Sequence, residues 1–182
     1  MRHRIFIAIN LPEEIKDKLV SYQHETEDLF SPCRGEDFNA KICRWTKKEN
    51  LHITLEFLGY LTDEELIELC RKTKETISQK KVFNVCLNKI CYAPPGKKIP
   101  KMIWILGDRI KEFNITPHIT LGRIKTWQFK QINPEERPEI DKKISPPAGG
   151  LTFEVKSIEI MESRLKKGGP EYMVLESIPL SK

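Results

Sequence analysis

Apolar residues along this chain follow patterns typical of strands in some places and of helices in others. Residues 5–9 form a continuous apolar run, which is typical of a strand buried on both faces. Pro12 follows, and Glu13 and Glu14 are the acidic residues expected in the first turn of a helix. The apolar stripe of that helix is predicted to be Ile15, Leu19, Tyr22 and Leu29. The chain therefore begins with a strand and then a helix.

A second helix is predicted after residue 62. Thr62 and Glu65 have the spacing of a capping box, in which each side chain bonds to the backbone N–H of the other residue. The apolar face of this helix is predicted to be Leu66, Leu69, Cys70, Thr73 and Ile77. Alternation and short apolar runs then predict strands over residues 83–87, 102–106, 153–161 and 172–175.

Polar and proline-rich segments separate these elements. Residues 31–41 form a polar loop, and residues 94–100 form a loop of proline, glycine and lysine. Residues 127–147 are charged and proline-rich, which favours an irregular excursion. Residues 166–170 predict the turn that joins the last two strands.

The tetrapeptide His-Ile-Thr-Leu occurs twice, at residues 52–55 and 118–121. Each copy alternates polar and apolar residues, so on a strand its histidine and threonine share one face and its isoleucine and leucine share the other. Of the other two histidines, His3 has no threonine two residues later, and His24 precedes Thr26 but lies in a polar helical stretch outside any repeat of the tetrapeptide, so we expect both to be solvated. An exact repeat of four residues indicates that both segments do the same job.

The repeated pair of side chains suits the displacement of an oxygen at a phosphodiester. Because an imidazole titrates near neutrality, one of His52 and His118 can accept a proton while the other donates one. The hydroxyls of Thr54 and Thr120 can donate hydrogen bonds to the phosphate oxygens. This scheme requires neither a metal nor a cofactor.

With these motifs the chain resembles the two-histidine phosphoesterases, in particular the RNA 2′,3′-cyclic phosphodiesterases that are also called 2′-5′ RNA ligases. The segments that carry the resemblance are residues 5–12, Arg44-Trp45, 49–59, Ile103-Trp104 and 117–123, with Ser163, Leu165, Gly169 and Tyr172 in the tail. The resemblance covers nearly the whole chain. It implies one α+β domain over residues 1–182, with two lobes related by a pseudo-twofold axis, antiparallel or mixed sheets, outer helices and a central cleft.

The resemblance also implies a place for the nucleobase. Phe57 and Arg123 each lie five residues after a motif histidine. In the family these positions flank the base of the terminal nucleotide, and aromatic and guanidinium planes both stack on bases. For Phe57 a place in the core is an equal alternative. Two interpretations stay open for four lysines, as cations that attract an RNA backbone or as solvated surface charges: Lys97, Lys98, Lys101 and Lys125.

Composition limits the kinds of partner and the compartment that we expect for this protein. A net charge of +5 allows an anionic substrate but falls short of a dedicated nucleic-acid coat. No apolar run is long enough to span a membrane or to serve as a signal peptide. The five cysteines are odd in number and irregularly spaced, which favours reduced thiols over disulfides or a zinc site. We therefore expect a cytoplasmic monomer.

These observations predict an enzyme that hydrolyses RNA 2′,3′-cyclic phosphate ends, or small cyclic nucleotides, to 2′-phosphomonoesters without a metal. By resemblance, His118 is the base for water and His52 is the acid for the leaving 3′ oxygen. Two alternatives stay open: a reversible 2′-5′ ligase of tRNA halves, and a module that binds nucleotides without catalysis.

The second half departs from the family between residues 106 and 118. The family has a helix here, but a connection that contains a helix takes at least about 10–12 residues. Only 11 residues are available, and residues 113–117 are β-branched or proline at three positions. We predict no full helix in this interval. One explanation is a tight link, with the outer face of the sheet covered by the 127–147 excursion or by a neighbouring molecule. The other is that residues are missing from this sequence.

Overall fold

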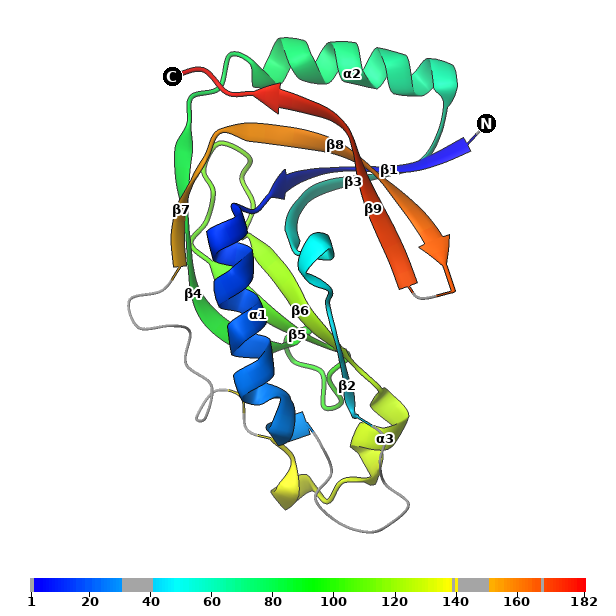
Figure 1. Cartoon of the computed structure of the whole chain (residues 1–182), viewed down its shortest axis with the longest axis vertical. Helices are drawn as coiled ribbons and strands as arrows, with labels where there is room; N and C mark the ends of the chain where they lie inside the picture. Colours follow the sequence, from blue (N-terminus) through cyan, green and yellow to red (C-terminus); the bar gives the residue numbers. More distant parts are fainter. Residues whose placement is uncertain (1, 31–40, 139, 141–150, 168) are drawn as a thin grey trace.

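The strands of the chain form two antiparallel sheets (Figure 1). The computed structural model describes all residues except 1, 31–40, 139, 141–150 and 168. Sheet A has the strand order β3-β1-β8-β9, and sheet B has the order β2-β6-β5-β4-β7. With the helices that accompany them, the two sheets confirm the α+β class that the sequence predicts.

The predicted elements are present, with longer strands than the apolar patterns alone indicate. Sheet A consists of β1 (Arg2–Asn10), β3 (His52–Thr62), β8 (Ser157–Lys166) and β9 (Gly169–Pro179). Sheet B consists of β2 (Cys43–Trp45), β4 (Phe83–Ala93), β5 (Met102–Gly107), β6 (His118–Ile124) and β7 (Leu151–Val155). The α-helices are α1 (Glu13–Glu27), α2 (Asp63–Ile77) and α3 (Thr126–Gln131), and the short 3-10 helices are η1 (Asp28–Phe30), η2 (Lys48–Asn50) and η3 (Pro134–Glu136).

Helix α1 lies across sheet B (Figure 1). Its predicted stripe is buried at Ile15, Leu19 and Tyr22, whereas Leu29 is half-buried in η1, beyond the end of the helix. The buried amide of Gln23 donates hydrogen bonds to the carbonyl oxygens of Leu121, at 2.8 Å, and of Thr46, at 3.0 Å. Helix α1 is thereby attached to β6 and to the segment that follows β2.

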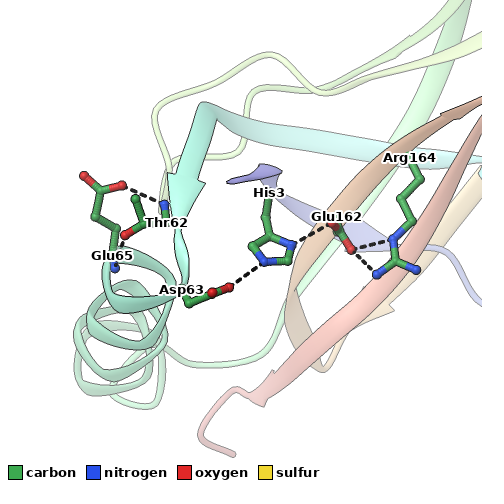
Figure 2. A network of polar contacts seen from close by, with 6 residues as sticks. All are labelled: His3, Thr62, Asp63, Glu65, Glu162 and Arg164. Carbon is green, nitrogen blue, oxygen red and sulfur yellow. Dashed lines mark hydrogen bonds and ion pairs between the residues drawn. The ribbon is translucent and has the colours of Figure 1, made fainter. Parts of the chain in front are cut away.

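Helix α2 begins with the capping box that the sequence predicts. The backbone N–H of Thr62 donates to Glu65 at 2.8 Å, and the backbone N–H of Glu65 donates to the Thr62 hydroxyl at 3.3 Å (Figure 2). The two contacts satisfy N–H groups that the first turn of a helix otherwise leaves without partners.

His3 lies beside this helix start, and its predicted solvation is wrong. Its Nδ1 is 2.8 Å from Glu162 on β8, and its Nε2 is 2.7 Å from Asp63 at the start of α2 (Figure 2). Both carboxylates raise the pKa of His3, Glu162 more than Asp63. Arg164 completes the network through a second contact with Glu162 at 2.8 Å. His24, by contrast, is exposed as expected.

The link between β5 and β6 confirms the predicted lack of a helix. Residues 108–117 turn back on themselves, and the backbone N–H of Ile110 donates to the carbonyl of Ile115 at 2.8 Å. The outer face of sheet B is instead covered by α1 (Figure 1). The 127–147 excursion contributes Phe129 and Ile140 to the same buried core, and its remaining part from 141 lies outside the described residues. A tight link is possible because the helix of the first half covers this face.

Two further predictions need correction. Residues 153–161 do not form one strand: β7 ends at Val155 and β8 begins at Ser157, with Lys156 between them. Strand β7 pairs with β4 in sheet B, whereas β8 pairs with β1 in sheet A. Apolar residues recur throughout 153–161 because both strands bury one face, although the strands belong to different sheets. The 127–147 excursion also begins with a short helix, α3, that its composition does not predict.

Candidate active site

A pocket of about 380 Å³ lies between the two sheets. Its walls include residues of β3 and β6, the strands that begin with the two copies of His-Ile-Thr-Leu. All six predicted site residues line it: His52, Thr54, Phe57, His118, Thr120 and Arg123. The remaining lining residues are Arg44, Trp45, Thr46, Lys47, Asn50, Met102, Trp104, Gly169, Pro170 and Tyr172.

The alternation predicted for the motifs explains how the strands present these side chains. Ile53, Ile119 and Leu121 are buried in the core, while the histidines and threonines between them are half-buried on the pocket side. Strand β3 is held by β1, with Asn10 opposite His52. Strand β6 is held by β5 and β2, so both motifs are fixed by regular backbone pairing.

The ring of His52 is held at both nitrogens. Its Nδ1–H donates to the carbonyl oxygen of Asn50 at 2.8 Å, and its Nε2 lies 3.0 Å from the hydroxyl of Thr54. Since a carbonyl can only accept, the proton of the neutral ring is on Nδ1, and the Thr54 hydroxyl donates to Nε2. The lone pair of Nε2 therefore lies on the side of the motif threonine.

Aromatic rings enclose His52. The ring centroid of Phe6 is 5.1 Å from that of His52, and the ring of Tyr172 approaches edge-on at 4.9 Å. Burial lowers the pKa of His52 below 6.5, the repulsion from His118 lowers it further, and the bond to the Asn50 carbonyl partly opposes both. His52 is consequently neutral at neutral pH in the empty pocket.

His118 is packed differently. The indole of Trp104 lies against its ring, with centroids 4.2 Å apart and planes inclined by 31°. Burial lowers the pKa of His118 below 6.5, and a hydrogen bond with the backbone of Thr116 opposes this. Each motif histidine is thus bonded to the backbone two residues before it, although the two rings have different aromatic neighbours.

The arrangement can stabilise a bound anion and move protons around it. Two imidazoles with lowered pKa values favour a neutral pair, and the negative charge of a phosphodiester between them would favour protonation of one ring. That state has the acid and the base that a displacement at phosphorus needs. Thr54 and Thr120 lie in the same pocket as hydroxyl donors.

Phe57 and Arg123 line the pocket from opposite sheets. Phe57 is 71 % exposed, so its alternative place in the core is wrong. Arg123 is exposed and reaches the sulfur of Met102 at 3.7 Å. An exposed aromatic ring on one wall and a guanidinium on the other are both groups that can stack on a flat ring.

Sequence reasoning assigned no site role to Trp104, Tyr172, Asn50, Arg44 or Lys47. All of these except Lys47 occur in the segments that carry the family resemblance, which was the available signal. Their place beside the motifs depends on strand pairing; Trp104, for example, lies opposite Thr120 in the β5–β6 register. Periodicity within one strand gives no information on its partner.

Two kinds of feature are absent from the described residues, a metal-ligand cluster and a membrane-spanning helix. No group of three or more histidine, cysteine, aspartate or glutamate side chains within the described ranges could hold a metal ion. No helix in the described parts of the chain is long and apolar enough to cross a membrane.

Comparison with known proteins gave consistent matches. The model of the LigT-like phosphoesterase family matches residues 9–104, a range that includes the first motif but not the second. An RNA 2′,3′-cyclic phosphodiesterase of Methanocaldococcus jannaschii is 29 % identical over 95 % of this chain and 98 % of its own length. One of Aquifex aeolicus is 29 % identical over 75 % of this chain and 81 % of its own length. A crystal structure of a Thermus thermophilus protein superposes with a TM-score of 0.70 at 25 % identity, covering 97 % of both chains.

Proposed function

The chain belongs to the LigT-like phosphoesterase family, and from that premise we propose that it hydrolyses RNA 2′,3′-cyclic phosphate ends to 2′-phosphomonoesters. The observation that carries the proposal is the convergence of both His-x-Thr units on one pocket. The relatives named RNA 2′,3′-cyclic phosphodiesterase support the reaction, since they match along most of their own lengths.

In the proposed reaction His118 accepts a proton from a water molecule as its oxygen forms a bond to phosphorus. The bond between phosphorus and the 3′ oxygen breaks, and His52 donates a proton to that oxygen. The phosphate remains on the 2′ oxygen and now contains the oxygen of the water. One proton has passed from water to His118, and another has passed from His52 to the 3′ oxygen. Thr54 and Thr120 donate hydrogen bonds to the non-bridging oxygens, where negative charge increases.

The hydrogen bond between Thr54 and His52 fits this proposal. While His52 is neutral, the Thr54 hydroxyl donates to Nε2, at 3.0 Å. Once the substrate's charge favours a protonated His52, Nε2 becomes a donor and no longer accepts this bond. The Thr54 hydroxyl is then free to donate to the phosphate. Substrate binding would thereby prepare both the acid and a phosphate donor.

We assign the exposed ring of Phe57 and the guanidinium of Arg123 to the two faces of the terminal base. Stacking on a ring face tolerates any base, so this contact gives affinity with little sequence preference. The proposal also places the chain in the cytoplasm as a monomer. The free thiols of Cys43, Cys70 and Cys86 support a reducing compartment, and light scattering tests the oligomeric state.

The direct test uses a short RNA that ends in a 2′,3′-cyclic phosphate. We expect conversion to an RNA with a 2′-phosphate, identified by its migration against 2′- and 3′-phosphate standards. Activity should persist in EDTA, because the scheme uses only side chains. A 3′-phosphate product, or RNA binding without any turnover, would contradict the proposal. Faster joining of cleaved tRNA halves than hydrolysis would instead favour the ligase alternative.

A further inference from the structure

Among the described residues that line the pocket, the charged side chains apart from the two histidines are all cations. They are Arg44, Lys47 and Arg123, and no aspartate or glutamate occurs among these described lining residues. All three cations are exposed. A cyclic phosphodiester has one negative charge, and the His-x-Thr units already supply its proton transfer and hydrogen bonds. The pocket thus has more positive charge than a cyclic phosphate alone requires.

The excess positive charge is concentrated where the two arginines lie. Arg44 lies directly opposite Arg123 in the antiparallel register of β2 and β6. Like charges in directly opposed positions of a sheet are unfavourable unless an anion lies between or beside them. Among the described residues neither arginine has an ion pair with a carboxylate. Lys47 has only Glu49, at 3.9 Å, with both side chains largely exposed, and such a pair contributes little.

The segment with Arg44 and Lys47 is held in place on both sides. The backbone N–H of Thr46 donates to the carbonyl of Leu121 at 2.8 Å, and the carbonyl of Thr46 accepts from Gln23 at 3.0 Å. The two cations therefore flank a backbone position that is fixed between β6 and α1. A fixed segment with cations at both ends suits a ligand group of defined position better than a diffuse attraction does.

We propose that Arg44 and Lys47 form a second phosphate subsite, for the phosphate on the 5′ side of the terminal nucleotide. The inference rests on the proposed hydrolysis of cyclic ends and adds a substrate preference to it. With the cyclic phosphate at the histidines and the base between Phe57 and Arg123, the 5′ phosphate is the remaining anionic group of the nucleotide. The enzyme should then prefer a terminal nucleotide with a 5′ phosphate over a nucleoside cyclic phosphate.

The experiment compares the hydrolysis of three substrates by the whole protein. These are adenosine 2′,3′-cyclic phosphate, its 5′-phosphorylated form, and a diadenosine dinucleotide with a 2′,3′-cyclic phosphate end. The measured quantity is the ratio of kcat/KM on each phosphorylated substrate to kcat/KM on the nucleoside substrate. We expect Arg44→Gln and Lys47→Gln each to lower this ratio roughly tenfold, the effect of one charge-assisted hydrogen bond. A larger loss with the dinucleotide than with the 5′ monoester would identify the internucleotide phosphate as the ligand.

Salt dependence and a matched control complete the test. Removing one cation that contacts a phosphate should reduce the slope of log kcat/KM against log salt by about 0.7 on the phosphorylated substrates. Lys89→Gln is the control, because Lys89 is exposed on β4 of the same sheet and does not line the pocket. It should leave the ratio unchanged. Equal losses on all three substrates in the Arg44 and Lys47 variants would overturn the subsite. If the unmodified enzyme hydrolysed none of the substrates, the proposed function itself would fail.

Discussion

The two His-Ile-Thr-Leu strands are identical in four residues but differ in the surroundings of their histidines. His52 is enclosed by the rings of Phe6 and Tyr172, and its Nε2 is bonded to Thr54. His118 has one aromatic neighbour among the described residues, Trp104, whose plane is inclined by 31° to its ring. The strands that supply these aromatic rings differ: β1 and β9 on the first side and β5 on the second.

The difference shows how one motif can serve two roles. In both units a backbone hydrogen bond two residues upstream fixes the ring, which the local sequence determines. The aromatic environment comes from elsewhere in the chain and decides how strongly the charged ring is disfavoured. Repulsion between the two rings further disfavours the doubly charged pair. A repeated motif therefore fixes ring geometry, and its different neighbours set how strongly each charged ring is disfavoured.

The strongest test of the comparison removes each histidine. His52→Ala and His118→Ala should each lower kcat on an RNA cyclic phosphate by about 10²- to 10⁴-fold, because each removes one side of the proton transfer. Loss of similar size in both would show that the two units are equally necessary. His24→Ala is the control, since His24 is exposed and outside the pocket. Near-normal turnover in either variant, with an unchanged thermal midpoint, would break the assignment.

The threonines should have smaller effects that differ between the two units. Thr54→Val and Thr120→Val remove a hydroxyl with little change in shape, and we expect a loss of about 10²-fold for one donor to the phosphate. Thr54→Val should also raise the pKa of His52, because it removes a donor to the neutral ring. A shift of the pH profile in Thr54→Val but not in Thr120→Val would sharpen the comparison. Identical shifts of the pH profile in both variants would contradict the proposed difference between the two motif units.

The pH profile measures the electrostatic difference directly. One histidine must be protonated and the other neutral, so kcat/KM should be bell-shaped, and its limbs belong to the pair as a whole. Because burial lowers both pKa values below 6.5, the maximum should lie on the acid side of pH 6.5. Tyr172→Ser should admit water to His52, raise its pKa and move the profile toward higher pH. Its effect on kcat should be smaller than that of either histidine substitution. A maximum well above pH 6.5 would contradict the burial argument.

His3 provides the opposite case and the smallest expected effect. Its pKa is raised by Glu162 and Asp63, so its contribution to the free energy of unfolding is fully present below the unfolded pKa. That contribution is lost as the pH rises through the folded pKa. His3→Gln should therefore lower the urea midpoint at acid pH and change it little at alkaline pH. The denaturation midpoints of the two proteins across this range give the measurement, and a pH-independent difference would show that His3 acts only by packing.

Sequence reasoning predicted the elements that depend on local spacing. The capping box of Thr62 and Glu65, the motif strands and the lack of a helix after β5 all follow from residues close together in the chain. Resemblance added Phe57 and Arg123, and the structure places both in the pocket. Their roles stay predictions.

The parts that could not be predicted depend on pairing between distant segments. The recurring apolar residues over 153–161 give no sign that the chain changes sheets at Lys156, because both strands are buried. The ion pairs of His3 depend on Glu162, which is 159 residues away. Likewise, the Arg44–Arg123 pair exists only in the register of β2 and β6. Hydrophobic periodicity indicates which face of a strand is buried, but it does not indicate which strand pairs with it.

The strand order of sheet A also has a consequence for the newly synthesised chain. Strands β1 and β3 are made early, but β8 and β9, which complete the sheet, are made after all the other described strands. The edge of β1 that pairs with β8 therefore stays open through most of translation, and Tyr172, which covers His52, arrives near the end. Contacts between such distant segments close slowly. Catalytic competence should accordingly appear only after β9 has been made, and a nascent chain stalled before residue 157 should have none.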